Sequence, residues 1–308
     1  MEFNHYPVLL NEILEGLNLT QGKVYIDATL GGGGYSYEIA KAIQPSGTLI
    51  ATDVDDDALL AAKEKLKEFD NVKIFKNNYS KIPQILNELG MEKITGGIVF
   101  DLGASYHQLT SDSRGFSFSK DSELDMRYDL TLKKTAKDVV NEYKEEDLVK
   151  IFSEYGEERF SKTIAREIVK QRKQKLFETT KELADFICRA VPFKAGHIHP
   201  ATKVFQAIRI EVNNELKNLQ QTLEQIIPLL EKDARIVVVS FHSLEDRIVK
   251  KAFRQYSSSC NCKPNDPICT CEPKKLELVN KKPILATQLE LAQNPPSRSA
   301  KLRVAQRI

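Results

Sequence analysis

Four consecutive glycines, Gly31–Gly34, separate a strand-like segment from a helix-like segment. The run before them, KVYIDAT (23–29), is short, apolar and contains β-branched residues, which is typical of a buried strand. The run after them, SYEIAKAI (36–43), has its apolar residues at helical spacing. A glycine-rich turn between a strand and a helix lets the backbone pass close to a ligand. This feature therefore predicts a nucleotide-like binding site on an α/β sheet.

Strands and helices continue to alternate through the first hundred residues. Further strands are expected at 47–53, 71–77 and 96–102, and helical runs at 57–69 and 81–89 lie between them. Such regular alternation at short intervals is typical of an open parallel sheet with helices on both faces. We therefore predict a Rossmann-like α/β fold.

The alternation stops after residue 102 and resumes only near residue 234. The intervening segment has a long polar loop and then helical patterns, and strands return at 234–241 and at the final residues. We therefore expect a sheet domain, residues 1–106 and 213–308, interrupted by a largely helical insertion domain, residues 107–212. The helices of the middle segment are expected at 136–152, 157–174, 179–190 and 201–231.

Composition is ordinary for a globular protein, with 41% hydrophobic and 29% charged residues. No apolar run approaches the roughly 20 residues of a membrane span, and the first residues lack the pattern of a signal peptide. We expect a cytoplasmic protein that does not enter a membrane.

The net charge of +2 conceals two basic segments. Residues 160–175 hold six basic residues and one acidic residue, and residues 272–308 hold eight basic and three acidic residues. Clustered Lys and Arg side chains bind phosphate backbones, but they also occur on solvated helix faces and in soluble tails. Both interpretations stay open for each segment.

Four of the five cysteines lie in the segment CNCKPNDPICTC. Such a cluster favours a metal site over disulfides in a cytosolic chain. Each pair is separated by only one residue, however, whereas zinc knuckles usually have two or more. A weak zinc site and a hairpin of reduced thiols are the two alternatives for Cys260, Cys262, Cys269 and Cys271.

The glycine run excludes the dinucleotide fingerprint in both registers. G-x-G-x-x-G would need a third glycine where the chain has Ser36 or Tyr37. The looser pattern D-x-x-x-G-x-G fits Asp27, Gly31 and Gly33. S-adenosylmethionine has no phosphate for such a loop to hold, so this pattern favours it as the cofactor.

Polar residues end three successive predicted strands. Asp53 lies 22 residues beyond Gly31, where a carboxylate accepts both ribose hydroxyls, although it also suits a helix N-cap. Tyr79 follows the third strand and either contacts the adenine or packs in the core. Asp101 ends the fourth strand, beside the crevice in which open sheets bind ligands.

The segment 199–216 predicts a long helix with two different faces. Thr202, Gln206, Arg209 and Asn213 share one polar face, which either lines a cleft or is the outer face of an ordinary amphipathic helix. An adjoining apolar face is expected to carry Val204, Ile208, Val212, Leu216 and Leu219.

Several further segments are unusually rich in polar residues that typically line sites. The segments are HYPVLLNE (5–12), DLGASYHQL (101–109), RGFSF (114–118), LDMR (124–127), YGEE (155–158), HPATKVFQAIRIEVNNEL (199–216), SFHSLEDRIVK (240–250) and PPSRSAKLR (295–303). From His5 to Arg303, and in matching order, they resemble the RsmH (MraW) family, bacterial methyltransferases that modify the N4 amine of a cytidine in 16S ribosomal RNA. The resemblance implies a class I S-adenosylmethionine-dependent methyltransferase fold with a helical insertion that recognises RNA.

The same resemblance implies a set of cofactor contacts. Two departures from the family concern this set, since Tyr35 replaces the usual histidine and SYHQL replaces SSPQL, bringing in Tyr106 and His107. A tyrosine keeps an aromatic ring and a polar tip, so we expect cofactor binding to be retained. The implied contacts are Gly33, Gly34, Tyr35, Asp53, Tyr79, Asp101 and Gln108.

Methyl transfer from a sulfonium needs mainly positioning and electrostatics from the protein. A carboxylate or carbonyl beside the cytosine N4 amine would make it a better nucleophile, but Asp101-Leu102-Gly103-Ala104 lacks the prolines of related DNA amino-methyltransferases. The target base must also leave its stack, and Phe116 and Phe118 either stack on it or are buried. The candidate catalytic residues are Asp101, Asp125, His199, Ser240 and His242.

Two other functions remain as alternatives at this point. A nicotinamide-dependent oxidoreductase would share the fold, and a non-catalytic RNA-binding assembly factor would share the basic segments. The expected partner is 16S rRNA in the small ribosomal subunit. The sequence leaves the oligomeric state open between a monomer and a homodimer.

Overall fold

A computed structural model describes residues 7–110, 114–192, 199–258 and 273–308 of the chain. It divides into two compact units, residues 1–103 with 216–308 and residues 104–215. The insertion domain is predicted at residues 107–212, and those limits stay a prediction, since the two units describe compactness alone. None of the described helices is long and apolar enough to cross a membrane. The cysteine cluster at 260–271 lies outside the described residues.

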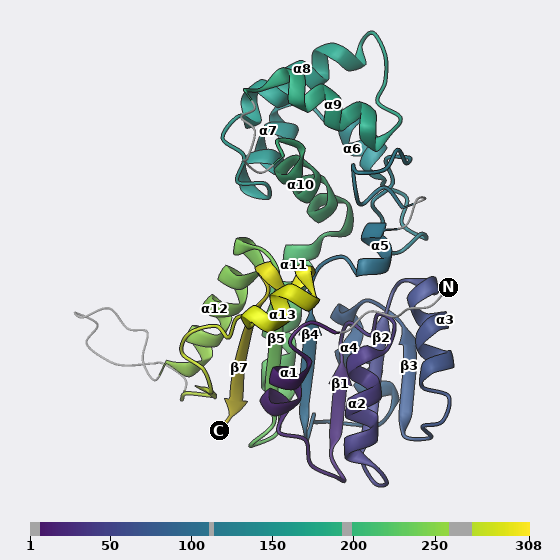
Figure 1. Cartoon of the computed structure of the whole chain (residues 1–308). Coiled ribbons are helices and arrows are strands. Elements are labelled where there is room, and N and C mark those ends of the chain that lie inside the picture. The colour runs from purple at the N-terminus through teal and green to yellow at the C-terminus, as the bar shows by residue number, and fades with distance from the viewer. Residues whose placement is uncertain (1–6, 111–113, 193–198, 259–272) are drawn as a thin grey trace, which may run out of the picture. The chain divides into compact units, whose positions relative to one another are not determined.

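The first unit is built on a seven-stranded sheet of the order β3-β2-β1-β4-β5-β7-β6 among the described residues (Figure 1). Strands β1 to β5 are parallel to one another, whereas β7 is antiparallel to both β5 and β6. The strands are β1 (Val24–Asp27), β2 (Thr48–Asp53), β3 (Val72–Lys76), β4 (Gly97–Asp101), β5 (Arg235–Ser240), β6 (Leu276–Leu278) and β7 (Lys301–Arg307).

Helices cover both faces of this sheet because alternate strand residues point to opposite sides. Tyr25 and Val99 face a core shared with α1, α2 and α3, whereas Ile26 and Ile98 face a second core shared with α4, α11 and α12. The helices of this unit are α1 (Leu10–Leu17), α2 (Gly34–Ile43), α3 (Asp56–Lys65), α4 (Ile82–Glu88), α11 (Glu215–Ile226), α12 (Ser243–Ser257) and α13 (Gln288–Gln293), with 3-10 turns η1 (Tyr79–Lys81), η2 (Ile227–Leu229) and η3 (Pro295–Ser299).

The second unit is helical and has its own hydrophobic core. Thr135 and Thr179 begin two of its helices with capping boxes, in which each side chain exchanges hydrogen bonds with the residue three positions later. Its helices are α5 (Tyr106–Thr110), α6 (Ala136–Glu142), α7 (Glu145–Glu154), α8 (Ser161–Arg172), α9 (Thr180–Ala190) and α10 (Ala201–Asn213).

Two of the long predicted helices are each interrupted. The run at 136–152 is broken between α6 and α7, where Tyr143 and Lys144 are extended. The run at 201–231 is broken at Asn214, which has a left-handed φ of 51°. Leu216 and Leu219 therefore belong to α11, and the prediction that they continue the apolar face of α10 is wrong.

Candidate active site

The glycine loop joins β1 to α2 and is held by the neighbouring strand. Leu30 N donates to Thr52 O at 3.0 Å, and Gly33 N donates to Leu30 O at 2.9 Å. Gly31 and Gly33 have φ values of 50° and 79°, in the left-handed region that glycine adopts without strain. These two positions account for the G-x-G part of the pattern.

Gly34 is required by packing against the N-terminal segment. A Cβ atom at this position would lie 2.5 Å from Cγ of Pro7. The next residue of the segment, Val8, accepts a hydrogen bond from Tyr35, and Leu9 N donates to Oε1 of Glu290 on α13 at 2.7 Å. Leu9 is buried and left-handed, with φ of 53°. The glycine loop, the start of the chain and α13 therefore form one bonded arrangement.

Asp53 ends β2 and binds the glycine loop directly. Its Oδ2 accepts from Gly31 N at 2.8 Å, while its Oδ1 accepts from Val54 N at 2.8 Å and Asp55 N at 3.0 Å. Burial raises the pKa of Asp53 above its usual value. The N-cap of α3 is Asp55 rather than Asp53, so the capping interpretation of Asp53 is wrong. Asp53 is partly exposed as a residue, and its ribose contact stays a prediction.

Asp101 ends β4 and shares a hydroxyl with Tyr35. The Tyr35 hydroxyl donates to Val8 O at 2.6 Å and lies 3.3 Å from Oδ2 of Asp101. Oδ1 of Asp101 is buried and has no hydrogen-bond partner among the described residues. Burial raises the pKa of Asp101 to about 7; the Tyr35 hydrogen bond opposes this, and the Asp27 and Glu245 carboxylates add to it. Asp101 is therefore poised to gain or lose a proton near neutrality.

Asp27 is a third carboxylate at this edge, and sequence reasoning used it only as part of a pattern. It is fully buried at the end of β1, where it accepts from Ser36 Oγ at 2.7 Å and Thr29 N at 3.2 Å. Thr29 in turn accepts Asp101 N at 2.7 Å on its Oγ1. Burial raises the pKa of Asp27 to about 6. The spacing D-x-x-x-G-x-G was the signal that pointed to this residue.

Tyr79 lies in η1 after β3 and packs on the sheet. Its ring meets Phe100 edge-on, with centroids 5.7 Å apart, and it borders the second core of the unit. The packing interpretation is thus supported, and the adenine contact stays a prediction.

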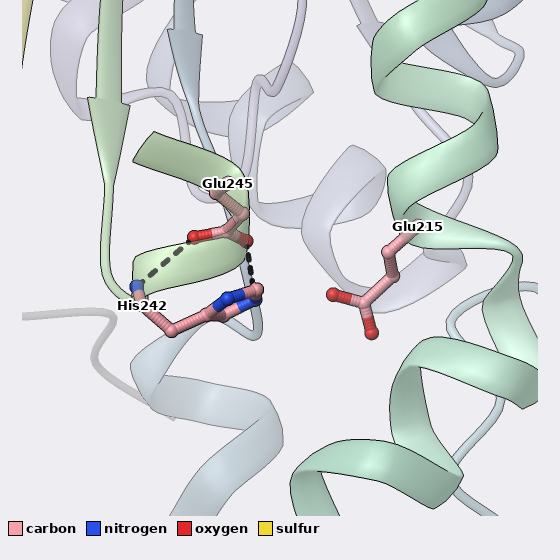
Figure 2. Close-up of side chains that lie close together, drawn as sticks. All are labelled: Glu215, His242 and Glu245. Carbon is pink, nitrogen blue, oxygen red and sulfur yellow. Dashed lines mark hydrogen bonds and ion pairs between the residues drawn. The ribbon is translucent and has the colours of Figure 1, made fainter. Parts of the chain in front are cut away.

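Ser240 and His242 lie beyond the end of β5. Ser240 is buried, and its Oγ lies 3.4 Å from Lys301 O. His242 precedes α12, and its Nε2 lies 3.1 Å from Oε1 of Glu245 (Figure 2). Oε2 of Glu245 accepts from Phe241 N at 2.9 Å and His242 N at 3.3 Å. The SLED segment is therefore a helix start that Glu245 caps, and a catalytic role of either residue stays a prediction. Glu215, also drawn in Figure 2, belongs to the second unit.

Gln108 lies on α5 and belongs to the second unit. It exchanges hydrogen bonds with Ser105, since Ser105 N donates to its Oε1 at 2.9 Å and its own N donates to Ser105 Oγ at 3.2 Å. Gln108 is buried and His107 is partly buried. The cofactor contact predicted for Gln108 stays a prediction.

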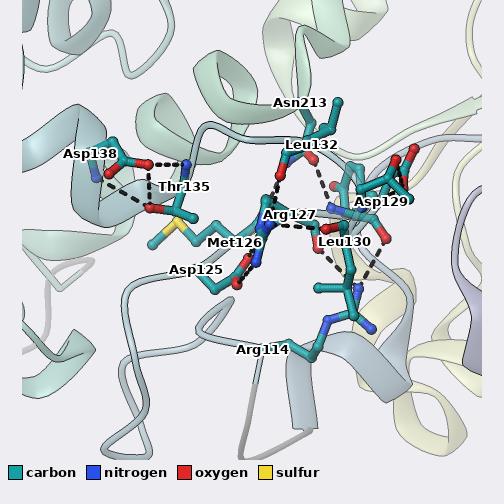
Figure 3. Close-up of polar contacts among 12 residues, drawn as sticks. Arg114, Asp125, Met126, Arg127, Asp129, Leu130, Leu132, Thr135, Asp138 and Asn213 are labelled. Carbon is teal, nitrogen blue, oxygen red and sulfur yellow. Dashed lines mark hydrogen bonds and ion pairs between the residues drawn. The ribbon is translucent and has the colours of Figure 1, made fainter.

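In the second unit, the carboxylate of Asp125 accepts hydrogen bonds from Arg127. Arg127 donates to Oδ1 of Asp125 through N and Nε, both at 2.9 Å, and to Oδ2 through Nη2 at 2.6 Å (Figure 3). Hydrogen bonds from Arg127 outweigh burial and lower the pKa of Asp125. A carboxylate held in this way suits a structural ion pair better than a proton acceptor.

Asn213 holds the same loop from α10. Its Nδ2 donates to Met126 O at 2.7 Å and Arg209 O at 2.9 Å, and its Oδ1 accepts from Tyr128 N at 2.8 Å (Figure 3). Met126 is buried with a φ of 61°, which a methionine rarely adopts. Asn213 therefore maintains a strained loop rather than lining a cleft.

His199 and the two loop phenylalanines pack within this unit. Phe116 is buried and stacked on Tyr128, while Phe118 stacks on His199 with centroids 4.5 Å apart. His199 Nδ1 accepts from Ala201 N at 3.2 Å, and its Nε2 lies 3.3 Å from Sγ of Cys188. The burial alternative is supported for Phe116, whereas Phe118 is partly buried against the same core.

A family model described as the MraW methylase family matches residues 2–308. The chain belongs to the MraW methylase family. Three curated relatives, each named "Ribosomal RNA small subunit methyltransferase H", are 48% identical to it. The relative from Clostridium botulinum (strain Loch Maree) aligns over 311 residues and 100% of both chains. That from Caldicellulosiruptor saccharolyticus covers 99% of this chain and 100% of its own. The relative from Carboxydothermus hydrogenoformans covers 100% of this chain and 99% of its own.

Membership of the MraW methylase family confirms the class I methyltransferase fold and S-adenosylmethionine as the cofactor. The residues at the strand ends fit this cofactor. Asp27, Asp53 and Asp101 form no ion pair with Lys or Arg among the described residues, so their charge favours a cationic sulfonium and disfavours a pyrophosphate. Oδ1 of Asp101 has no hydrogen-bond partner among the described residues, so it can accept a hydrogen bond from a bound ligand. Asp53 would hold the ribose.

Proposed function

We propose that this MraW-family chain transfers a methyl group from S-adenosylmethionine to the N4 amine of a cytidine in the 16S rRNA of the small ribosomal subunit. The cytidine and its N4 position come from the family resemblance, and the small-subunit rRNA also from the names of the relatives. The observation that carries the chemical part is the group of carboxylates at the ends of β1, β2 and β4. They supply negative charge and a titrating group in one place.

Bound S-adenosylmethionine supplies a methyl group already activated on a sulfonium. A bond forms from the amine nitrogen to the methyl carbon while the carbon–sulfur bond breaks, and its electron pair stays on sulfur. The nitrogen must also lose one proton. Asp101 supports this step because its carboxylate has a pKa of about 7 and an unpartnered oxygen, so it can accept that proton at physiological pH.

The direct test is a tritiated-methyl assay with small ribosomal subunits and with free 16S rRNA that lack the modification. We expect incorporation into at least one of them, and mass spectrometry of the digested RNA should identify N4-methylcytidine. No incorporation into either substrate would support an assembly factor without activity. Binding of a nicotinamide dinucleotide in place of S-adenosylmethionine would support the oxidoreductase.

Asp53 provides the sharper test of the cofactor site. Asp53→Asn keeps the size of the side chain but removes the charge that accepts both ribose hydroxyls. We expect S-adenosylmethionine affinity to fall about 10- to 100-fold, in line with the loss of charge-assisted hydrogen bonds. Asp55→Asn, which keeps an N-cap side chain for α3, is the matched control and should retain affinity. Equal affinity in both variants would contradict the ribose role.

The proposal also includes a cytoplasmic location, where ribosomal subunits are assembled, and leaves a homodimer to experiment. Light scattering on the purified chain measures the mass in solution. A mass of two chains would support the homodimer, and a mass of one chain across the working concentration range would exclude it.

A further inference from the structure

One face of α8 carries a line of exposed cations. Lys162, Arg166, Lys170 and Lys173 follow one another at intervals of four, four and three residues, so they lie along one side of the helix. All four are exposed, whereas Ile164, Ala165 and Ile168 on the opposite side are buried. We call these four residues the cationic stripe.

Carboxylates are scarce along this stripe. Glu167 is the only acidic residue within α8, and its Oε1 lies 3.3 Å from Nε of Arg166. Elsewhere in the second unit, cations are paired across elements: Lys134 with Glu211, Lys137 with Glu178, and Lys175 with Glu182. Like charges four residues apart on a helix cost about 0.2–0.5 kcal/mol each, and among the described residues only the contact of Arg166 with Glu167 offsets this repulsion by an ion pair.

The second basic segment differs, because the structure uses several of its cations internally. Arg303 forms an ion pair with Asp246 at 2.7 Å, and Lys301 approaches the same carboxylate at 3.9 Å. Arg307 donates to Lys275 O at 2.9 Å, and Lys275 lies over the ring of Tyr256. For this segment the structural role accounts for much of the charge, whereas for α8 it does not.

We infer that the cationic stripe of α8 binds the phosphate backbone of the RNA substrate. The first and last residues of the stripe, Lys162 and Lys173, are eleven positions or about 16 Å apart, a length over which one strand presents about five phosphates. A rigid helix with evenly spaced cations matches a polyanion of regular charge spacing. The inference rests on the proposed function, since it names the surface that holds the proposed substrate.

α12 is the main competing surface, because it exposes Arg247, Lys250, Lys251 and Arg254. These residues span seven positions, or about 10 Å, and fewer phosphates can lie along them at once. We therefore expect the stripe to contribute more to RNA binding than α12 does.

The test replaces all four stripe residues by glutamine (K162Q, R166Q, K170Q and K173Q). A matched control, K137Q, K144Q, K150Q and K181Q, removes the same charge from exposed positions of the same unit. A third variant carries R247Q, K250Q, K251Q and R254Q on α12. Binding to free 16S rRNA and to small subunits is measured across salt concentrations, separately from methyl transfer. Circular dichroism and S-adenosylmethionine affinity confirm that each variant folds.

We expect the stripe variant to bind free RNA about 10- to 100-fold more weakly at physiological salt, and the slope of log affinity against log salt to become shallower by about three. The control should stay within about threefold of the wild type. Equal losses in the stripe and control variants, or a larger loss in the α12 variant, would overturn the inference. A loss confined to assembled subunits would indicate an acidic ribosomal protein and would overturn it too.

Failure of the proposed function gives a different result. If the wild-type chain transfers no methyl group to rRNA, the function is refuted whatever the stripe binds. If the wild type methylates rRNA and the stripe variant binds RNA as the control does, only the inference about the stripe fails. With both correct, the stripe variant should show a raised KM for the RNA and an unchanged kcat at saturation.

Discussion

Tyr35 places one hydroxyl between the first described residues of the chain and the end of β4. The hydroxyl donates to Val8 O at 2.6 Å and to Oδ2 of Asp101 at 3.3 Å, so the contact with Asp101 favours the charged form of that carboxylate. The groups that face this pair are Asp27 from β1, Glu245 from α12 and Glu290 from α13. All three are acidic, and two of them, Asp27 and Glu245, raise the pKa of Asp101. The hydrogen bond from Tyr35 is the contribution that lowers this pKa.

Tyr35→Phe should therefore shift the pH dependence of methyl transfer. The hydrogen bond from Tyr35 lowers the pKa of Asp101, so its removal raises that pKa above about 7. If the carboxylate is the active form, the acidic limb of the kcat profile moves to higher pH and the rate above that limb is retained. Single-turnover rates between pH 5.5 and 9 measure this shift, and Tyr37→Phe on the same helix is the control. An unmoved limb would separate Asp101 from proton transfer.

Asp27 is expected to cost stability at neutral pH. Its pKa is about 6 in the folded chain against 3.8 in the reference state, so the folded state holds the proton more tightly. Stability therefore falls as pH rises from about 4 to 6 and then levels off. Asp27→Asn keeps a hydrogen bond to Ser36 and should raise the unfolding free energy by up to about 3 kcal/mol at pH 7, since each pKa unit is worth about 1.4 kcal/mol. Denaturant titrations at pH 4 and pH 7 should show the gain at pH 7 alone.

At the scale of elements, α10 maintains the loop from Leu124 to Tyr128 through a single amide. Asn213→Ala removes the bond donated to Met126 O and the bond accepted from Tyr128 N, and so leaves the strained Met126 without this tether. We expect a loss of about 2–4 kcal/mol in the stability of the second unit. Thr202→Ala, at an exposed position of the same helix, should change stability by less than about 0.5 kcal/mol. Thermal melting of both variants distinguishes a structural amide from a surface one.

The elements with strong local signals could be predicted from the sequence. The first five strands are short runs rich in apolar residues that end in polar residues, and this pattern predicts where each strand lies in the chain. β6 has only three residues, too few to form a period, and the helix breaks at Tyr143 and Asn214 contain neither glycine nor proline.

Some features of the candidate site could be predicted from the sequence, and others could not. Asp53 and Asp101 could be predicted because each ends a strand, where the chain itself gives the position. The bonds of Tyr35 to Val8 and of Leu9 to Glu290 could not, because they join segments up to 281 residues apart. The ion pair that engages Asp125 also depends on the loop conformation, which no local pattern indicates.

At the scale of the whole molecule, two units with separate cores should respond differently to ligand. S-adenosylhomocysteine at 100 times its Kd should stabilise a unit that binds it by about 2.7 kcal/mol. Asp53 belongs to the first unit, so we expect calorimetry to show the transition of that unit rising in the wild type. With Asp53→Asn the rise should shrink, and an equal rise in both proteins would contradict the ribose role of Asp53.

The arrangement of β7 has a consequence for how the protein is made. β7 is the last strand in the chain, yet it lies between β5 and β6, and Leu302 and Val304 complete the core that packs against α1 and α2. Glu290, also near the end, holds Leu9 beside the glycine loop. Because synthesis proceeds from the N-terminus, this core and the bond that holds Leu9 beside the glycine loop stay incomplete until β7 and Glu290 have been made. A nascent chain that ends before β7 should therefore leave the apolar faces of α1 and α2 partly uncovered.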